Sequence, residues 1–110
     1  MHKTTSNFVQ RVWNLCKKIP KGKVSTYMDI AIALGNKNYA RAVANALRKS
    51  PGTPYVPCHR VVRSNGFIGG FNKGIKQKIA LLKAEGIIVK NNRVSNFNTV
   101  RITSDQLAGS

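Results

Sequence analysis

Residues 26–49, TYMDIAIALGNKNYARAVANALRK, determine the fold that we expect for this chain. Thr26 is typical of a helix N-cap, and Asp29 follows three residues later, in the position of a capping box. Gly35 ends this first helix, and a second helix is predicted over about residues 38–49. Two short helices separated by a tight turn form a helix-turn-helix pattern.

The second of these helices has two chemically different faces. One face is apolar and comprises Tyr39, Val43, Ala46 and Leu47. The other is small and basic, and comprises Ala40, Arg41, Ala44, Asn45 and Arg48. Its polar side chains recur at positions i, i+4 and i+7, and its alanines permit the close approach of a partner. A solvated helix face has the same pattern, but the preceding turn and the charge of the chain favour contact with DNA.

The chain is strongly basic: 19 Lys and Arg residues and only 3 Asp and Glu residues give a formal net charge of +16. Such a surface attracts polyanions, and nucleic acid is the leading candidate. An anionic membrane surface, or a composition that serves solubility, is the alternative. No stretch approaches the ~20 apolar residues of a transmembrane helix, and the N-terminus lacks the apolar core of a signal peptide, so we expect no membrane partner.

Length and cysteine usage limit the architecture. With 110 residues, the chain is expected to form a single domain over residues 1–110 and to act as a monomer. Two Cys and two His, with few carboxylates, do not make a usual four-ligand zinc site, so we expect no metal. Cys16 lies on the apolar stripe of a helix predicted over about residues 7–19, which makes it a core residue rather than a disulfide partner. The pattern indicates a reduced, intracellular protein.

Turn signals predict two short hairpins. Ser64-Asn65-Gly66 lies between two apolar pairs within residues 61–68, and Asn-Gly suits the positive φ of a hairpin turn. Asn91-Asn92 lies at the centre of a second, basic hairpin within residues 87–94, which has the character of a wing. Farther along, residues 100–102 are a candidate for a short strand.

A last clear helix is predicted from Ile75 to Ala84, and Gly86 follows it as a C-cap. Ile75, Ile79 and Leu82 form one apolar face of this helix. The expected fold class is therefore mainly α with small β hairpins, a winged helix-turn-helix-like single domain.

The hexapeptide Pro57-Cys58-His59-Arg60-Val61-Val62 places a nucleophile beside a base. A cysteine thiolate is strongly nucleophilic, and a neighbouring base or cation lowers the pKa of the thiol. Pro57 fixes its own φ, so Cys58 is expected at a rigid, non-helical bend. A small buried thiol beside an unrelated imidazole would give the same pattern, and adjacency argues against a protease-like dyad. If Cys58 and His59 cooperate, a water or a tight turn joins them.

Glu85 is the unusual residue at the end of the last predicted helix. A carboxylate in the last turn opposes the helix dipole, and Glu85 is one of only three acidic residues in the chain. Two interpretations remain open: a surface glutamate attracted to the many Lys and Arg side chains, or a buried acid that orients and polarises a histidine.

Four ordered motifs occur between about residues 7 and 90. They are Gly22-Lys23-Val24-Ser25-Thr26-Tyr27, Ala40-Arg41-Ala42-Val43, the Cys58 hexapeptide and Leu81-Leu82-Lys83-Ala84-Glu85-Gly86. In order and spacing they resemble the motifs of the methylated-DNA–protein cysteine methyltransferases, the alkylguanine-DNA alkyltransferases. The resemblance implies single-turnover transfer of an alkyl group from the oxygen at position 6 of guanine in double-stranded DNA to Cys58. It also implies that the nucleotide is first flipped out of the duplex, and that no cofactor is needed.

The resemblance implies roles for individual residues. Glu85 matches the family's relay glutamate, which polarises His59, and His59 draws the proton from Cys58 through a water. Tyr27 matches the tyrosine that donates to the leaving base. Arg41 matches the arginine that inserts through the minor groove in place of the extruded base, where its planar charged head stacks better than Lys would.

Two larger sets of positions follow from the same resemblance. The recognition helix of the family enters the minor groove, and the DNA-binding residues implied here are Arg41, Ala40, Ala44, Asn45, Arg48 and Lys49. The implied pocket for the flipped guanine, around an active-site segment of about residues 55–74, comprises Tyr27, Leu47, Ser50, Val61, Phe71 and Asn72, with the carbonyl groups of Cys58 and Val61 among the groups that read the base.

Three positions depart from the family pattern. Ser50 stands where Asn is common and has a shorter reach with which to hold the active-site turn. Phe71 replaces a frequent tyrosine and loses its hydroxyl group, and Asn45 stands where a small glycine is common, which affects the fit to the groove. Many family members also carry an additional N-terminal domain, sometimes with zinc, whereas this chain starts directly at the catalytic domain.

Three other functions are compatible with parts of this sequence. Alkyltransferase-like proteins share this compact domain and recognise alkylguanine without transfer, but they generally replace the reactive cysteine, often with Trp, whereas Cys58 is present here. A winged-helix transcription regulator would explain the charge and the helix-turn-helix but leaves Cys58, His59 and Glu85 without a role. A cysteine hydrolase fits less well than either.

Overall fold

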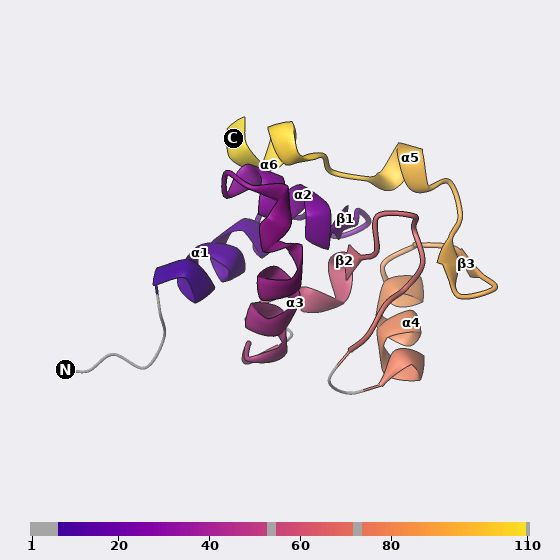
Figure 1. Ribbon diagram of the computed structural model, residues 1–110. Helices are drawn as coiled ribbons and strands as arrows, with labels where there is room; N and C mark the ends of the chain where they lie inside the picture. Colours follow the sequence, from indigo (N-terminus) through magenta and orange to yellow (C-terminus); the bar gives the residue numbers. More distant parts are fainter. Residues whose placement is uncertain (1–6, 53–54, 72–73, 110) are drawn as a thin grey trace.

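The computed structural model describes residues 7–52, 55–71 and 74–109. Figure 1 shows its helices and strands, which in chain order, with the 3₁₀ turns η1 and η2, are α1 (Asn7–Cys16), β1 (Ser25–Thr26), α2 (Tyr27–Ala33), η1 (Lys37–Tyr39), α3 (Ala40–Arg48), η2 (Cys58–Arg60), β2 (Val61–Val62), α4 (Ile75–Ala84), β3 (Val89–Lys90), β4 (Arg93–Val94), α5 (Phe97–Val100) and α6 (Ser104–Gly109). Within these described ranges, no helix is long and apolar enough to cross a membrane. The fold is mainly helical with small strands, as predicted.

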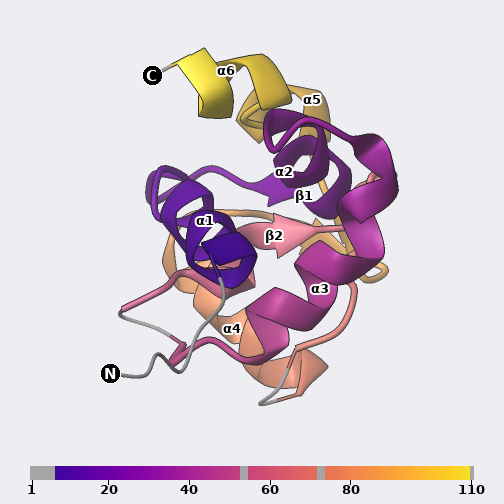
Figure 2. The ribbon, with the colours of Figure 1, turned by 60° about the vertical axis from the view of Figure 1, so that its left-hand side comes forward.

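The strand β2 lies between two hydrophobic clusters. It pairs in parallel with β1, so that Ser25 lies opposite Val61 and Thr26 opposite Val62; Figure 2 shows the two strands side by side in the middle of the molecule. Because successive strand residues point to opposite faces, Val61 packs into the cluster built from α1, α2, α3 and α6, whereas Val62 packs into the cluster of α4 and β4. The segment that follows Cys58 is therefore anchored on both sides.

The predicted helix-turn-helix is confirmed as α2 and α3. The Thr26 hydroxyl accepts a hydrogen bond from the backbone N–H of Asp29 at 2.9 Å and donates one to its carboxylate at 2.8 Å, so the predicted N-cap forms. The second helix begins at Ala40, because residues 37–39 form the tighter turn η1. Tyr39, which the sequence pattern assigns to the apolar face of the second helix, lies instead in this turn, where it is 41% exposed and its ring packs edge-on against Phe8.

The helix α4 has the predicted bounds and the predicted C-cap. Gly86 adopts a φ of +88°, and the N–H of the next residue, Ile87, donates to the carbonyl of Leu82 at 3.0 Å. Its apolar face, however, is only partly buried. Ile75 is 47% exposed and lines a pocket, while Lys78 is completely buried beside Leu82.

Of the two predicted hairpins, the second is confirmed and the first is wrong in its pairing. Strands β3 and β4 are antiparallel, and Asn91 and Asn92 between them have φ values of 53° and 61°. In the first, residues 63–66 do form a turn, but Val61–Val62 pairs with β1, and Phe67 pairs instead with Arg93. A strand buried on both faces has a stronger partner in another buried strand than in an exposed turn.

The secondary structure near both ends of the described chain differs from the sequence-based prediction. The helix α1 ends at Cys16 rather than at Ile19, because the last N–H groups of this segment bond to carbonyls three residues back. Residues 100–102 do not form a strand; instead Arg101 makes an isolated parallel bridge with Val24. Leu107 of α6, a helix that the sequence did not predict, is fully buried in the first cluster.

Candidate active site

Cys58 lies directly after a tight backbone bend. Pro57 has φ −79° and ψ 60°, the geometry of an inverse γ-turn, and the N–H of Cys58 donates to the carbonyl of Val56 at 2.8 Å. Cys58 then opens the 3₁₀ turn η2, whose last N–H, from Val61, donates to the Cys58 carbonyl. The predicted bend is present at Pro57, but Cys58 itself begins a 3₁₀ turn, so the prediction that it is non-helical is wrong. The Cys58 side chain is half-buried at the edge of a pocket.

Ser50 contacts the sulfur. Its hydroxyl donates to Sγ of Cys58 at 3.5 Å and accepts from the backbone N–H of Gly52 at 3.2 Å. The shorter serine therefore still links the end of α3 to the cysteine. Cys16, the other cysteine, is fully buried in the first cluster, and burial raises the pKa of its thiol.

His59 and Glu85 are brought together, although 26 positions of sequence separate them. His59 is 1% exposed, and its Nε2 lies 3.2 Å from Oε1 of Glu85, whose side chain is 13% exposed. Of the two interpretations of Glu85, the structure therefore supports the acid that contacts a histidine. Burial lowers the pKa of His59, and the hydrogen bond and charge of Glu85 only partly oppose this effect. His59 is thus a neutral imidazole at pH 7 that is able to accept a proton.

Arg60 is a part of this site that sequence reasoning missed. Its guanidinium forms two parallel hydrogen bonds with Glu85, at 2.9 Å from Nε and 2.6 Å from Nη2, and a third with the carbonyl of Ile19 at 2.8 Å. Burial would raise the pKa of Glu85, but the hydrogen bonds from Arg60 and His59 outweigh burial and hold it below its usual value. The only indication of this role in the sequence was that Arg60 belongs to the hexapeptide that contains Cys58 and His59.

Lys78 is the second residue that sequence reasoning missed. Its Nζ donates to the carbonyls of Val61 at 2.7 Å and Gly70 at 3.1 Å, and it lies 5.9 Å from the centroid of the Tyr27 ring. Burial lowers the pKa of Lys78 to about 8. The ammonium group ties the strand after the cysteine to the loop that forms the pocket floor. The sequence did contain an indication of its role: Lys78 lies at helical spacing on the same face as the apolar residues Ile75, Ile79 and Leu82.

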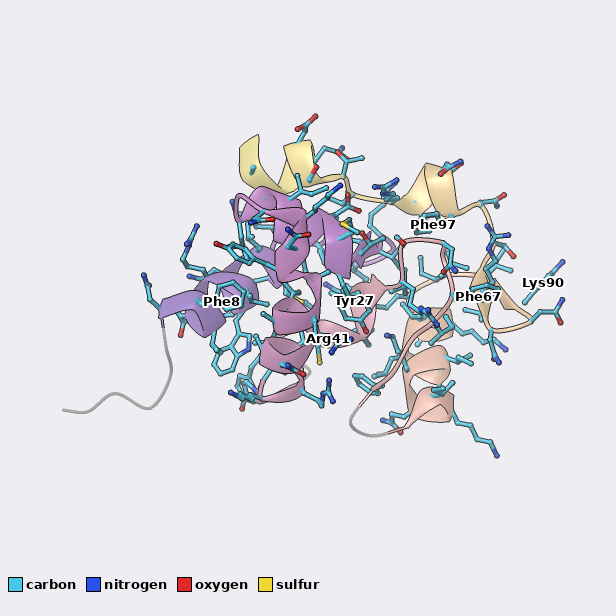
Figure 3. The ribbon with its side chains drawn as sticks, in the orientation of Figure 1. Phe8, Tyr27, Arg41, Phe67, Lys90 and Phe97 are labelled. Atoms are coloured by element: carbon cyan, nitrogen blue, oxygen red, sulfur yellow. The ribbon has the colours of Figure 1, made fainter. Side chains whose placement is uncertain are left out.

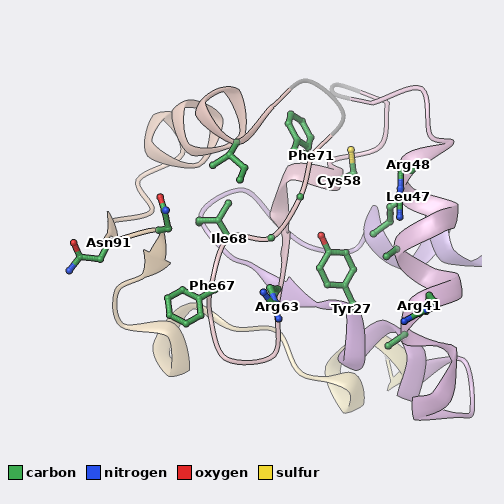
Figure 4. Close-up of a pocket in the computed structure, with 16 residues that line it drawn as sticks. Tyr27, Arg41, Leu47, Arg48, Cys58, Arg63, Phe67, Ile68, Phe71 and Asn91 are labelled. Atoms are coloured by element: carbon green, nitrogen blue, oxygen red, sulfur yellow. The ribbon is translucent and has the colours of Figure 1, made fainter.

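A pocket of about 1070 Å³ lies beside Cys58. Figure 4 shows α3 along one side of it, Tyr27 and Cys58 in the middle, and Phe67 and Asn91 on the other side. Burial raises the pKa of Tyr27, and the neighbouring Cys58 raises it further, so its hydroxyl stays protonated and is able to donate. Most of the predicted site residues line this pocket, namely Tyr27, Ala40, Arg41, Ala44, Leu47, Arg48, Cys58 and Phe71.

The remaining predicted residues that the structure describes lie around the pocket rather than in its lining. Asn45 and Lys49 are exposed on and just after α3, and Asn45 accepts a hydrogen bond from Arg48 at 2.8 Å. Val61 is buried, and its carbonyl is bonded to Lys78. Asn72 lies outside the described residues. The lining also includes residues that sequence reasoning did not identify, namely Arg63, Phe67, Ile68, Gly69, Gly70, Ile75, Asn91 and Asn92.

Gly69 determines the space beside Tyr27. It has a φ of +74°, and a Cβ atom there would lie 3.3 Å from the Tyr27 hydroxyl and 3.2 Å from Cγ of Arg63. Glycine is thus required both by the backbone conformation and by the close approach of these side chains. Among the described residues, no three His, Cys, Asp or Glu side chains are grouped so that they could hold a metal ion.

The sequence and the fold of this chain are similar to those of known proteins. Residues 7–87 match the family model described as 6-O-methylguanine DNA methyltransferase, DNA binding domain. Over 86 residues the chain is 44% identical to a methylated-DNA–protein-cysteine methyltransferase of Metallosphaera sedula, an alignment that covers 78% of this chain and 53% of that protein. The chain spans about half the length of the curated methyltransferases of this name that it matches.

Two solved structures bound to DNA have the same fold. One is S. pombe Atl1 in complex with damaged DNA containing O6-carboxymethylguanine, with a TM-score of 0.79 and 29% identity over 92% of this chain and 99% of that one. The other is Mycobacterium tuberculosis OGT in complex with DNA, with a TM-score of 0.71 and 40% identity over 74% of this chain and 51% of that one.

Proposed function

This chain belongs to the 6-O-methylguanine DNA methyltransferase family, and on that premise we propose that it repairs DNA by transferring an alkyl group from the oxygen at position 6 of guanine to Sγ of Cys58. One observation carries the proposal: the half-buried Cys58 opens onto a pocket with a basic helix on one side, and the residue after it is a buried histidine in contact with a glutamate. A structural cysteine would need neither the pocket nor the acid–base pair.

The reaction follows from these groups. His59, through a water, takes the proton of Cys58, and the thiolate attacks the alkyl carbon. An S–C bond forms as the C–O bond breaks, and the electron pair of that bond stays on the guanine, which is neutralised by a proton from Tyr27. The lowered pKa of His59 keeps its imidazole unprotonated, and the raised pKa of Tyr27 keeps its hydroxyl protonated, so each group is in the protonation state that its role requires.

Glu85, Arg60 and Lys78 act as positioning residues in this mechanism. Glu85 orients His59, and the two parallel hydrogen bonds from Arg60 restrict the plane of the carboxylate. Lys78 holds the Val61 carbonyl and thereby the strand that follows the nucleophile.

A base within a duplex cannot present its alkyl carbon to Cys58, so the nucleotide has to be flipped into the pocket, at an unstacking cost of a few kcal/mol. Arg41 is exposed on α3 at the edge of the pocket, with Ala40 and Ala44 beside it. We assign to Arg41 the role of filling the gap in the stack. The small alanines permit α3 to approach the minor groove closely.

Mass spectrometry tests the proposal. Incubation with a duplex that contains one O6-methylguanine is expected to add one methyl group to the peptide that contains Cys58. Excess duplex is expected to give a plateau of about one methyl group per molecule, because the thioether product is stable to general acid–base groups. Sustained turnover, or a methyl group on any other peptide, would contradict the proposed reaction.

A second candidate function is lesion recognition without transfer. It is favoured by one observation, namely the similarity to Atl1 along almost the whole length of that protein. The same incubation separates the two functions, because a recognition protein would bind the methylated duplex tightly and leave the mass of the Cys58 peptide unchanged.

Replacing Glu85 with Gln is expected to lower the rate of methyl transfer by about tenfold or more, because a neutral amide still contacts His59 but no longer polarises it. Glu85 raises the pKa of His59 against the effect of burial, so its loss lowers that pKa further. Since His59 acts in its neutral form, the rate falls as the pH drops through its pKa. This acidic limb should therefore lie at lower pH in the variant than in the parent, below a reduced plateau.

Asp105→Asn is the matched control for this experiment. It removes the same charge from an exposed position on α6, outside the pocket. It is expected to keep both the plateau and the position of the acidic limb, and circular dichroism verifies that the Glu85 variant is folded. A Glu85→Gln variant that reacts at the parent rate across the whole pH range would show that Glu85 does not act on His59.

A further inference from the structure

One wall of the pocket lies opposite α3. It is formed by the β3–β4 hairpin and by the turn around residues 63–67. Asn91 and Asn92 line the pocket together with Phe67 and Arg63. Figure 3 shows Tyr27 between Arg41 of α3 and Phe67, with Lys90 beyond Phe67 at the outer end of the hairpin. The pocket therefore lies between two separate structural elements, only one of which belongs to the helix-turn-helix.

This wall is held in place by backbone hydrogen bonds. The N–H of Ile68 donates to the carbonyl of Asn92 at 2.9 Å, and the N–H of Val94 donates to the carbonyl of Gly66 at 2.9 Å. Asn91 and Asn92 adopt left-handed conformations, which asparagine tolerates better than most residues, and they produce the sharp turn at the hairpin tip. The N–H of Arg63 donates to the carbonyl of Phe67 at 2.9 Å. The hairpin and residues 63–68 thus form one interlocked unit.

Three basic side chains project from this unit, namely Arg63, Lys90 and Arg93, and all three residues are exposed. Arg93 is also ordered: its Nε donates to the carbonyl of Asn65 at 2.9 Å, and its guanidinium lies 5.8 Å from the centroid of the Phe67 ring. An ordered arginine loses little side-chain entropy when it contacts an anion.

The positive charge of this wall is not neutralised by any Asp or Glu side chain, all three of which lie in the described residues. Asp29 pairs with Arg101 through two hydrogen bonds at 2.9 and 2.7 Å, and Glu85 pairs with Arg60. Asp105 lies on α6. These are the three acidic residues of the sequence, and none of them is among the described residues that line the pocket. The wall is therefore electrostatically complementary to a partner with negative charge.

We propose that the hairpin wall, consisting of Arg63, Phe67 and residues 90–93, is a second DNA-contacting surface. It binds the sugar–phosphate backbone on the side of the flipped nucleotide away from α3, so that the duplex is held on both sides of the pocket. The charge complementarity of the wall and its continuity with the pocket assign DNA as the occupant. The inference rests on the proposed function in one respect, namely that a damaged duplex docks over Cys58.

The salt dependence of DNA affinity tests this surface. The variants Lys90→Ser and Arg63→Ser/Lys90→Ser are made in a Cys58→Ala background, so that a duplex with one O6-methylguanine is bound but not consumed. Each lost phosphate contact lowers the slope of log affinity against log salt by about 0.9. We expect a loss of up to about one unit for the single variant and up to about two for the double variant.

The matched control is Lys17→Ser/Lys21→Ser, which removes two positive charges from exposed positions outside the pocket lining. It is expected to keep the parent slope. An unchanged slope in the double hairpin variant, or an equal loss in the control, would overturn the proposal. So would a double variant that binds DNA with the parent slope but loses affinity for phosphatidylserine vesicles, since the wall would then serve a membrane.

Two measurements separate this inference from the proposed function. The thermal unfolding midpoint of each variant verifies that the fold is retained. Methyl transfer by the protein with Cys58 intact tests the chemistry independently of the hairpin. If the parent transfers the methyl group and the hairpin variants keep its salt slope, only the second surface is wrong; if the parent neither binds nor repairs the duplex, the proposed function itself fails.

Discussion

Replacing Cys58 with alanine is expected to abolish methyl transfer completely while the protein still binds a duplex that contains O6-methylguanine. The substitution removes the only atom that we propose as the acceptor. It deletes a single half-buried sulfur, so the free energy of DNA binding should change by less than about 1 kcal/mol. Binding is measured by fluorescence anisotropy of a labelled duplex, and transfer by the mass of the peptides.

Cys16→Ala is the matched control for this experiment, because it removes the only other sulfhydryl group in the chain. Cys16 is completely buried, and burial raises the pKa of its thiol, so it is neither accessible nor ionised at neutral pH. The control is expected to keep full transfer with some loss of stability. Methyl transfer by the Cys58→Ala variant to any residue would show that another group is the acceptor.

Replacing Arg41 with alanine is expected to slow repair of the duplex by about 10- to 100-fold, because the variant has no side chain to fill the gap that costs a few kcal/mol of stacking. Reaction with free O6-methylguanine, which needs no extrusion from a duplex, should be much less affected. Single-turnover rates on the two substrates provide the comparison.

Arg11→Ala controls for the loss of one positive charge, since Arg11 is exposed on α1 and does not line the pocket. It is expected to reduce repair of the duplex only slightly. If Arg41→Ala slowed the two substrates equally, Arg41 would belong to the fold or to the chemistry, and its proposed role in flipping would be wrong.

Features that depend on neighbouring residues could be predicted from the sequence alone. The N-cap at Thr26, the C-cap at Gly86 and the turn at Asn91-Asn92 each rest on local hydrogen bonds or on φ values that particular residues favour. The bend at Cys58 is of the same kind, because Pro57 restricts its own backbone. These local rules were sufficient to place the helix-turn-helix and the position of the nucleophile.

The parallel pairing of β1 with β2 could not be predicted in this way. Both strands are two residues long, so neither has an alternation of polar and apolar residues from which a partner could be deduced. The turn at residues 64–66 favoured a local hairpin, but Val61 and Val62 are each buried in a different cluster. Only the packing of both clusters determines that β2 lies at the centre.

The sequence by itself determined which chemistry this protein carries: a cysteine beside a histidine, a lone glutamate at a helix end and a basic helix-turn-helix. The tertiary structure alone decided how the charges are used. Arg60 pairs with Glu85 and Lys78 is buried against Val61 because the chain folds distant segments together. The sequence has 19 basic residues, and composition cannot show which of these side chains are buried and which are exposed to a partner. Burial of a charged side chain depends on contacts between segments that are far apart in the chain.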